Sequence, residues 1–449
     1  MKRFLVIMSV LSCLIVVVVP TLTTPEYPSW IALHSGVTIF DTSLAIMLCL
    51  TVATVIGFLI SRSETHSPFL LQLFVAALLG RVLVGTAIFA FNGQTFFGGD
   101  TFTYDLAGYL QLNGWGGDHY CQAMAAEIVN KPGTGWGMVY YVAAIYGLVG
   151  RNLLATQLVN AVLGAATAPL IFLSTWTAFN NSRAARFAGL AVAFMPSLVL
   201  WSSQGLKDGP IMFFLALAIL ATLKLGQRLC LSYSIALIGA LICVLAFRFY
   251  VFYMLMAAIV GSLFIGTGAL TARSLLRTFV LVIMLGFMLV YFGLTRHSFM
   301  QIRTFSALET VQVSRIDASN SAQSGFAGTT DVSTMTGAVS AVPRGLLYLL
   351  FAPFPWELGS LRQAITLPEM LVWWASFPML VLGLWFSIKY RLRQVLLILI
   401  FTFMLSLAYS VFQGNVGNAY RERAQLLMFY FIFAAVGYVL MYERGAGRP

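Results

Sequence analysis

The stretch PFLLQLFVAALLGRVLVGTAIFAF at residues 68–91 decides the fold class of this chain. It contains 24 residues and a single charged side chain, Arg81. About 20 apolar helical residues are enough to cross the hydrocarbon core of a bilayer. The whole chain follows this pattern, because 60% of its 449 residues are apolar and 9% are charged, with a mean hydropathy of +0.88. These values predict an all-α polytopic membrane protein whose residues 1–449 form a single transmembrane domain.

Hydropathy predicts twelve transmembrane helices. One further apolar stretch, 136–150, is left out because its 15 residues include three tyrosines, which suits an interfacial or re-entrant segment. Pro196 is expected to kink the fifth span. The predicted spans are 4–20, 43–61, 68–91, 154–178, 186–203, 210–226, 230–247, 250–267, 278–294, 369–388, 394–412 and 425–441.

Charge assigns a side to each loop. With 136–150 excluded, both termini and the basic loops, such as 389–393, become cytoplasmic, and 13 of the 15 acidic residues fall outside. This arrangement obeys the positive-inside rule and predicts a multi-pass protein of the plasma (inner) membrane. Two large outer loops follow, 92–153 and 295–368, with amphipathic juxtamembrane helices. Residues 314–341 hold 18 Ser, Thr, Gly or Ala among 28 and are predicted to form a mobile loop over the site.

The remaining composition excludes some functions. The net charge of +11 comes from Lys and Arg spread singly or in pairs, so no nucleic-acid partner is expected. The five cysteines show no metal-ligand spacing and predict neither a zinc site nor a disulfide framework.

Asp100 is the strongest candidate for chemistry. It follows Gly98-Gly99, shortly after the third span, in a chain with few carboxylates. A carboxylate at the membrane boundary can serve as a general base toward a lipid-borne substrate. The alternative is that Asp100 caps an amphipathic helix over 101–112. Gly116-Gly117-Asp118 repeats the arrangement before 119–129, and there the cap interpretation is favoured.

A second polar cluster lies between the fifth and sixth predicted spans. Gly205 is expected to end one helix, and Pro210 to begin the next. Lys207 and Asp208, on the same side as Asp100, offer a cation for a phosphate and a carboxylate for sugar hydroxyls. A simple capped turn is the alternative.

Arginines on the outer side form a third group. Positive charge there opposes the usual bias, which indicates an anionic ligand, although about half of these side chains are expected to pair with carboxylates. Arg81, inside a span, is expected to belong to a buried ion pair. The aromatic segment 351–357, which ends at Glu357, suits either a groove for a lipid tail or an interfacial anchor. The outer arginines are Arg248, Arg296, Arg303, Arg344, Arg362, Arg421 and Arg423.

Three short motifs resemble the membrane-embedded GT-C glycosyltransferases, especially the polyprenyl-phosphate-sugar-dependent branch of protein mannosyltransferases and aminoarabinose transferases. Gly99-Asp100-Thr-Phe-Thr-Tyr104 is similar to the motif of their first outer loop. The turn that contains Ser202-Ser203 and Lys207-Asp208 is similar to a second motif, and 415–423 resembles bacterial polysaccharide-biosynthesis relatives. Two spans precede the usual first helix, and Thr rather than a second acid follows Asp100. The paired-carboxylate metal site of some members is therefore in doubt.

The resemblance implies transfer of a sugar from a polyprenyl-phosphate donor to a hydroxyl of a glycan, lipid or cell-envelope polysaccharide, with inversion, on the extracytoplasmic face. Asp100 would act as the base, while Asp208 would orient hydroxyl groups. No cofactor is certain, and a divalent metal is left open. The expected partners are the donor, the acceptor and membrane lipids. Substrate-binding residues would be Lys207, Tyr104, Arg248, Arg344, Arg421, Arg423 and Glu357.

Three alternatives remain open at this point. One is a polysaccharide polymerase or ligase that uses a diphosphate-linked donor. Another is a transporter of lipid-linked saccharides, which would need polar groups deep inside its helices. The third is an assembly subunit without activity. Because the polar residues gather at one face of the membrane, the enzyme interpretation is favoured over transport.

Overall fold

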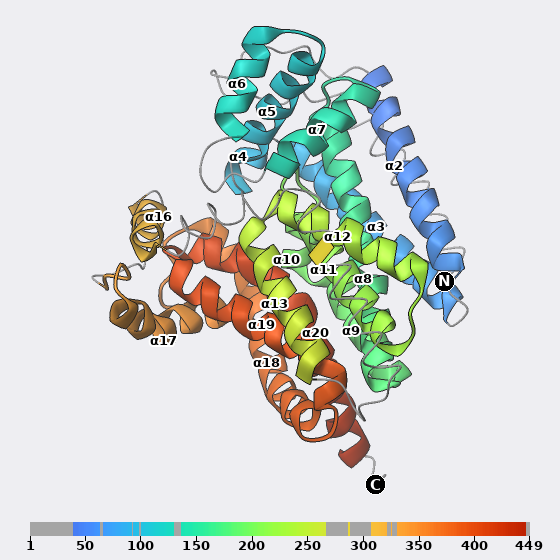
Figure 1. The fold of residues 1–449 in the computed structure, drawn as a ribbon, viewed down its shortest axis with the longest axis vertical. Coiled ribbons are helices and arrows are strands. Elements are labelled where there is room, and N and C mark those ends of the chain that lie inside the picture. The colour runs from blue at the N-terminus through green and yellow to red at the C-terminus, as the bar shows by residue number, and fades with distance from the viewer. Residues whose placement is uncertain are drawn as a thin grey trace. The chain divides into compact units, whose positions relative to one another are not determined.

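The computed structural model describes residues 39–62, 66–91, 93–97, 100–129, 136–265, 286–287, 307–320, 325 and 330–445. Within these residues the secondary structure is helical apart from one isolated β-bridge between Gly325 and Asn415 (Figure 1). Contacts between residues divide the chain into two units. Unit 1 is Met1–Phe172, Gly189–Leu217 and Ile242–Phe249; unit 2 is Leu173–Ala188, Ala218–Leu241 and Tyr250–Pro449.

Seven of the described helices are long and apolar enough to cross a membrane. A bent pair, α9 (Ser182–Phe194) and α10 (Pro196–Ser202), forms an eighth candidate, with 53° between its two halves. The prediction of a helical, multi-span membrane protein is therefore confirmed. The seven helices are α2 (Ile39–Ser61), α3 (Ser67–Ala90), α8 (Leu153–Phe179), α11 (Asp208–Gln227), α18 (Leu361–Tyr390), α19 (Leu392–Phe412) and α20 (Val416–Gly445).

The predicted spans agree with the described helices. The spans 230–247 and 250–267 correspond to α12 (Leu231–Phe247) and α13 (Phe249–Ile265), two shorter apolar helices of 17 residues each. The span 4–20 lies outside the described residues, and so does 278–294 except for residues 286–287. The total of twelve stays a prediction. The excluded stretch forms α7 (Trp136–Val149), whose 14 residues place it among the shorter helices.

The described residues of 92–153, the predicted first outer loop, form a compact group of helices in unit 1. After the four-residue α4 (Gln94–Phe97) come α5 (Asp100–Trp115) and α6 (His119–Val129), which pack on each other, and α7 packs on α5 (Figure 1). Gly108 permits the approach of α5 and α7, because a β-carbon there would lie 2.7 Å from Cβ of Val142. Both predicted amphipathic segments, 101–112 and 119–129, are helices.

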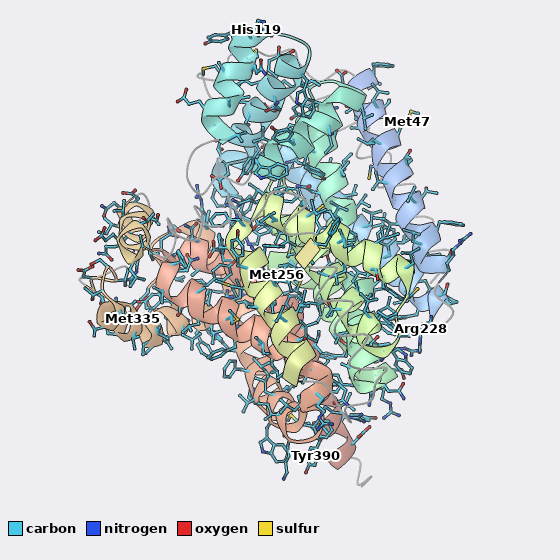
Figure 2. All side chains as sticks on the ribbon, viewed as in Figure 1. Met47, His119, Arg228, Met256, Met335 and Tyr390 are labelled. Carbon is cyan, nitrogen blue, oxygen red and sulfur yellow. The ribbon has the colours of Figure 1, made fainter. Side chains whose placement is uncertain are left out.

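In unit 2, the predicted second outer loop differs from the sequence expectation at both ends of 314–341. Residues 314–320 belong to α16 (Leu308–Asn320) and residues 335–341 to α17 (Met335–Phe351), which begins at the exposed Met335 (Figure 2). The loop prediction is wrong there, because Ala338 and Ala341 of α17 and Val311 of α16 are buried together in one apolar cluster, and this tertiary packing stabilises both helices. Residues 321–324 and 326–329 lie outside the described residues, and mobility stays a prediction.

The kink predicted at Pro196 is present and is stabilised by Arg81 of α3. Proline has no N–H group, so the carbonyl of Val192 loses its helical donor. Arg81 Nη2 donates to that carbonyl at 3.2 Å, Nη1 donates to the carbonyl of Ala193 at 2.9 Å, and Nε donates to Ser202 Oγ at 2.8 Å. The expectation of an ion pair is wrong, because in the described part of the chain this buried guanidinium bonds carbonyls and a hydroxyl instead.

We expect Arg81→Met to destabilise the protein, because it leaves buried carbonyls at the kink without donors. Hydrogen bonds to a charged group contribute about 1.5–3 kcal/mol each, so the loss should reach at least about 3 kcal/mol. The measurement is thermal unfolding of the detergent-purified protein. Pro196→Ala restores an N–H donor for Val192, so Arg81→Met should cost less in that background. An equal loss in both backgrounds would contradict this role for Arg81.

Candidate active site

Asp100 and the turn between α10 and α11 lie close together in unit 1. Asp100 is the first residue of α5 and is exposed, whereas Thr101 is fully buried. A β-carbon at Gly205 would lie 2.8 Å from Thr101 Cγ2 and 3.2 Å from Leu153 Cδ1. The first turn of α5 therefore packs directly on the turn that precedes Lys207. This contact brings the segment that begins at Asp100 next to the turn that leads into Lys207 and Asp208, two of the groups that the sequence predicted.

The turn at residues 203–207 is held by a side chain of α8. Asn160 Nδ2 donates to the carbonyls of Gln204 and Leu206, at 2.7 and 2.8 Å. Asn160 Oδ1 in turn accepts a hydrogen bond from Tyr141 of α7, at 2.9 Å. Because backbone groups of the turn are bonded from a neighbouring span, its conformation does not depend on its own sequence alone.

Asp208 forms a buried ion pair with Arg248. Arg248 Nη2 lies 3.2 Å from Asp208 Oδ1, and the two residues are 5% and 0% exposed. Asp208 begins α11, where a negative charge is favoured by the helix dipole, and Arg248 stands at the junction of α12 and α13. The structure thus pairs two of the predicted site residues. Lys207, half-buried, directly precedes this pair.

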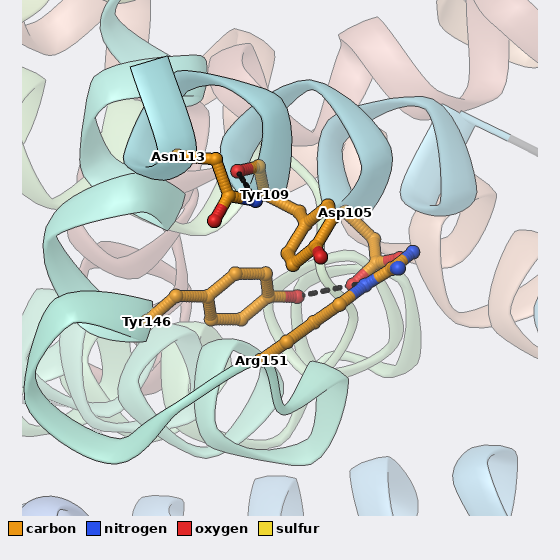
Figure 3. Close-up of polar contacts among 5 residues, drawn as sticks. All are labelled: Asp105, Tyr109, Asn113, Tyr146 and Arg151. Carbon is orange, nitrogen blue, oxygen red and sulfur yellow. Dashed lines mark hydrogen bonds and ion pairs between the residues drawn. The ribbon is translucent and has the colours of Figure 1, made fainter. Parts of the chain in front are cut away.

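Asp105 is a site residue that the sequence interpretation missed. It is 1% exposed, and Arg151 Nη2 donates to its Oδ2 at 2.5 Å while the Tyr146 hydroxyl donates to its Oδ1 at 2.5 Å (Figure 3). The guanidinium of Arg151 also lies 4.6 Å from the ring centroid of Tyr109. These contacts join α5 to α7 and to the start of α8. An acidic residue inside an otherwise buried helix face was the available signal, because such a carboxylate needs a partner.

Asp118 caps α6, as the sequence predicted. The backbone N–H of Cys121 donates to Asp118 Oδ1 at 3.0 Å, and this hydrogen bond lowers the pKa of the exposed carboxyl. Gly117 precedes it with φ at 99°, a left-handed conformation that favours glycine. The second Gly-Gly-Asp motif therefore has a structural function.

Arg423 of unit 2 caps the opposite end of a helix, the C-terminus of α17. It is 1% exposed, and its Nη1 donates to the carbonyls of Leu349, Leu350 and Ala352, at 3.4, 3.1 and 2.8 Å. These groups lie at the C-terminal end of α17, where carbonyls lack helical donors and a positive charge is favoured. Arg423 therefore stabilises the end of α17. Arg421, two residues earlier, is half-buried.

Arg344 and Glu357 are brought together around Tyr348 in unit 2. The Tyr348 hydroxyl donates to Glu357 Oε2 at 2.9 Å, and the Arg344 guanidinium lies 5.7 Å from the ring centroid. Burial and the hydrogen bond to Glu357 raise the pKa of Tyr348. In the segment after α17, Phe354 stacks on Trp356, with 5.2 Å between ring centroids. Helix α17 and this segment therefore combine both charges with exposed aromatic surface.

A second carboxylate that the sequence interpretation missed is Glu369, near the start of α18. It is 4% exposed and accepts a hydrogen bond from the Tyr420 hydroxyl at 2.5 Å. The guanidinium of Arg423 lies 5.1 Å from the Tyr420 ring centroid. Glu369 therefore belongs to the buried polar network of α20 rather than to an exposed anion site.

Two of the four remaining predicted residues belong to the described part of the chain. Tyr104 is half-buried on α5, and Arg362 is exposed at the start of α18. Arg296 and Arg303 lie outside the described residues. In the part of the chain that the structure describes, no three His, Cys, Asp or Glu side chains form a group that could hold a metal ion.

Comparisons with known proteins give one structural similarity. No protein-family model matches the sequence, and a comparison with curated proteins finds no significant match. Among solved structures, the chain is similar to the crystal structure of ArnT from Cupriavidus metallidurans bound to undecaprenyl phosphate. The TM-score is 0.44 and the sequence identity is 17%, over 70% of this chain and 51% of that chain. This chain therefore spans about half the length of that protein.

We expect Asp105→Asn to destabilise the protein, because it leaves the guanidinium of Arg151 without its carboxylate. Removing one partner of a buried ion pair typically costs about 3–5 kcal/mol. Thermal unfolding of the purified protein is the measurement. Asp118→Asn is the matched control and should change little, since Asn caps a helix as well as Asp does. Equal unfolding temperatures for the wild type and Asp105→Asn would show that the pair does not stabilise the fold.

Proposed function

We propose that this protein is a membrane glycosyltransferase that moves a sugar from a polyprenyl-phosphate-linked donor to an acceptor hydroxyl on the extracytoplasmic face. The observation that carries the proposal is the contact between Thr101 and Gly205. It puts the carboxylate of Asp100 at the start of a helix that packs on the turn before Lys207. A base and a cation within one group of helices match what sugar transfer from a phosphate requires.

The proposed reaction uses these groups in one displacement. The carboxylate of Asp100 takes the proton of the acceptor hydroxyl, and the resulting oxygen attacks the anomeric carbon of the donor. The bond from that carbon to the phosphate oxygen breaks, so the configuration inverts and polyprenyl phosphate leaves. Its negative charge is stabilised by Lys207 and by the N-terminus of the 20-residue helix α11.

Asp208 has a different role in this proposal from the one that its motif implied. Its carboxylate is bonded to Arg248, and the pair is buried. It therefore fixes the start of α11 and the α12–α13 junction, and so positions Lys207. In unit 2, Arg421, Arg344 and Glu357 are proposed to bind charged or hydroxyl groups of a substrate, whereas Arg423 caps α17.

The contacts of Arg81 do not favour the transporter alternative. It needs polar side chains available to a substrate inside the membrane. Arg81, the charged residue within α3, instead bonds the backbone at the Pro196 kink. We therefore propose an enzyme and not a transporter. The same residues would also accommodate a donor whose sugar is linked to the lipid through a diphosphate.

We expect Asp100→Asn to abolish most sugar transfer while folding survives. Asn preserves the shape and the capping ability of Asp, but it cannot take the proton. Loss of a positioned base usually lowers the rate by about 10²–10⁴-fold, so transfer should fall at least a hundredfold. The measurement is transfer of a radiolabelled sugar from a polyprenyl-phosphate donor by membranes that contain each variant.

The control for this experiment is Asp118→Asn. It changes the same residue type in the same Gly-Gly-Asp motif, at a position where the carboxylate caps α6. This variant should keep its activity. If Asp100→Asn transfers sugar at the wild-type rate, Asp100 is not the base and the proposed mechanism is wrong.

Sidedness is tested separately. We expect residue 127 to face the outside and residue 183 the cytoplasm, because the charge distribution assigns the loops in this way. Glu127→Cys and Arg183→Cys, both at exposed positions, are introduced into a variant without native cysteines. A membrane-impermeant maleimide should label intact cells at 127 only. Labelling at 183 but not at 127 would reverse the orientation and move the proposed site to the cytoplasmic face.

A further inference from the structure

Three buried polar side chains of unit 1 have atoms without hydrogen-bond partners among the described residues. Thr101, Gln157 and Gln204 are each 0% exposed. In the described part of the chain, no hydrogen-bond partner exists for Thr101 Oγ1, for Gln157 Nε2 and Oε1, or for Gln204 Oε1. Gln204 Nε2 donates to the carbonyl of Leu200 at 3.1 Å, so only the amide oxygen of this side chain lacks a partner.

All three side chains lie around the turn at residues 203–207. Thr101 approaches Gly205 directly, and Gln204 is part of the turn. Gln157 belongs to α8, four residues after Leu153 and three before Asn160. Leu153 approaches Gly205, and Asn160 bonds two carbonyls of the turn. Because residues at these spacings share one helix face, Gln157 faces the turn as well.

Leaving such groups without partners is costly. A buried donor or acceptor that lacks a hydrogen bond destabilises a protein by about 1–3 kcal/mol. Native structures contain few of them, and functional sites are one place where they are retained. Four such atoms beside one turn therefore mark a place where a group outside the described residues would supply hydrogen bonds.

The chemistry of the three side chains defines what they would bind. Two carboxamides and a hydroxyl both donate and accept hydrogen bonds, and none of them carries a charge. They match hydroxyl groups rather than a phosphate. The same turn leads into Lys207, the residue proposed to bind the donor phosphate. A hydroxyl-rich group next to that phosphate is the sugar of the donor.

We propose that Thr101, Gln157 and Gln204 form an uncharged subsite for the hydroxyl groups of the donor sugar. This inference rests on the proposed function and adds a sugar-recognition site to it. Sugar hydroxyls replace the missing partners, so each bond formed on binding also removes a buried unsatisfied group. The subsite then discriminates between sugars by their hydroxyl groups. A sugar that lacks a hydroxyl at the right position leaves a buried polar group of the protein without a hydrogen bond, which lowers its affinity.

The experiment separates sugar binding from phosphate binding. The full chain in lipid nanodiscs is titrated with polyprenyl phosphate, with polyprenyl phosphoglucose and with polyprenyl phosphomannose. The wild type should prefer at least one sugar-bearing lipid to the bare phosphate. Gln157→Leu and Gln204→Leu should reduce that preference about tenfold each, which corresponds to about 1.4 kcal/mol, and leave the affinity for the bare phosphate unchanged. Asp118→Asn, outside this subsite, should keep the preference.

Unfolding temperature is the second readout. If Gln157 lacks partners before the ligand binds, Gln157→Leu should unfold at the wild-type temperature or above it, because an unsatisfied polar group is removed. Gln204→Leu also loses the hydrogen bond to the Leu200 carbonyl and is expected to unfold at a slightly lower temperature. Thr101→Val and Gln157→Met, which preserve side-chain volume, are the second set in case leucine is not accommodated. A lower unfolding temperature in all four variants would overturn the proposal, because ordered water or protein groups would then already satisfy these side chains.

Two further outcomes would also overturn it: a wild type that binds all three lipids equally, or variants that keep the full sugar preference. Neither outcome depends on transfer activity. The proposed function fails on a different result, wild-type transfer by Asp100→Asn, so failure of the subsite is distinguishable from failure of the enzyme assignment.

Discussion

The hydrogen bonds between Arg81 and the broken helix α9–α10 are the interaction on which the described site depends. A span interrupted by Pro196 exposes carbonyls that have no donor in an apolar environment. Arg81 satisfies two of them and also holds Ser202 at the end of α10. The next residues form the turn that leads to Lys207 and Asp208. Arg81 therefore links α3 to the helix that leads into that turn, while Asn160 of α8 holds the turn itself.

The composition explains why arginines have this role repeatedly. The chain has 26 basic and only 15 acidic residues, so not every cation can pair with a carboxylate of its own. Backbone carbonyls at helix ends and kinks are the alternative acceptors, and Arg81 and Arg423 both use them. Asp208 and Asp105 instead pair with Arg248 and Arg151. An arginine in this protein, buried or predicted to lie on the outer side, is therefore weak evidence of an anionic ligand until its neighbours are known.

Much of the fold follows from local sequence, whereas most of the polar contacts do not. Apolar runs, and glycine and proline at their ends, were sufficient to predict the spans that the structure describes, the kink at Pro196 and the cap at Asp118. Asp105 was missed because its partners, Tyr146 and Arg151, lie 41 and 46 residues away, a distance over which a single sequence gives no pairing signal. The ends of 314–341 were mispredicted for a similar reason. Their small residues favour a loop in isolation, and burial against other helices decides otherwise.

Gly205 has a consequence for how relatives of this chain would diverge. Its lack of a side chain permits Thr101 to approach, since a β-carbon would lie only 2.8 Å from Thr101 Cγ2. A mutation to alanine would push α5 away from the turn unless position 101 became smaller at the same time. The two positions are therefore expected to covary across homologues, with Ser, Ala or Gly at 101 wherever 205 carries a side chain. Such covariation would record, in sequences alone, the close packing of two segments that are about a hundred residues apart.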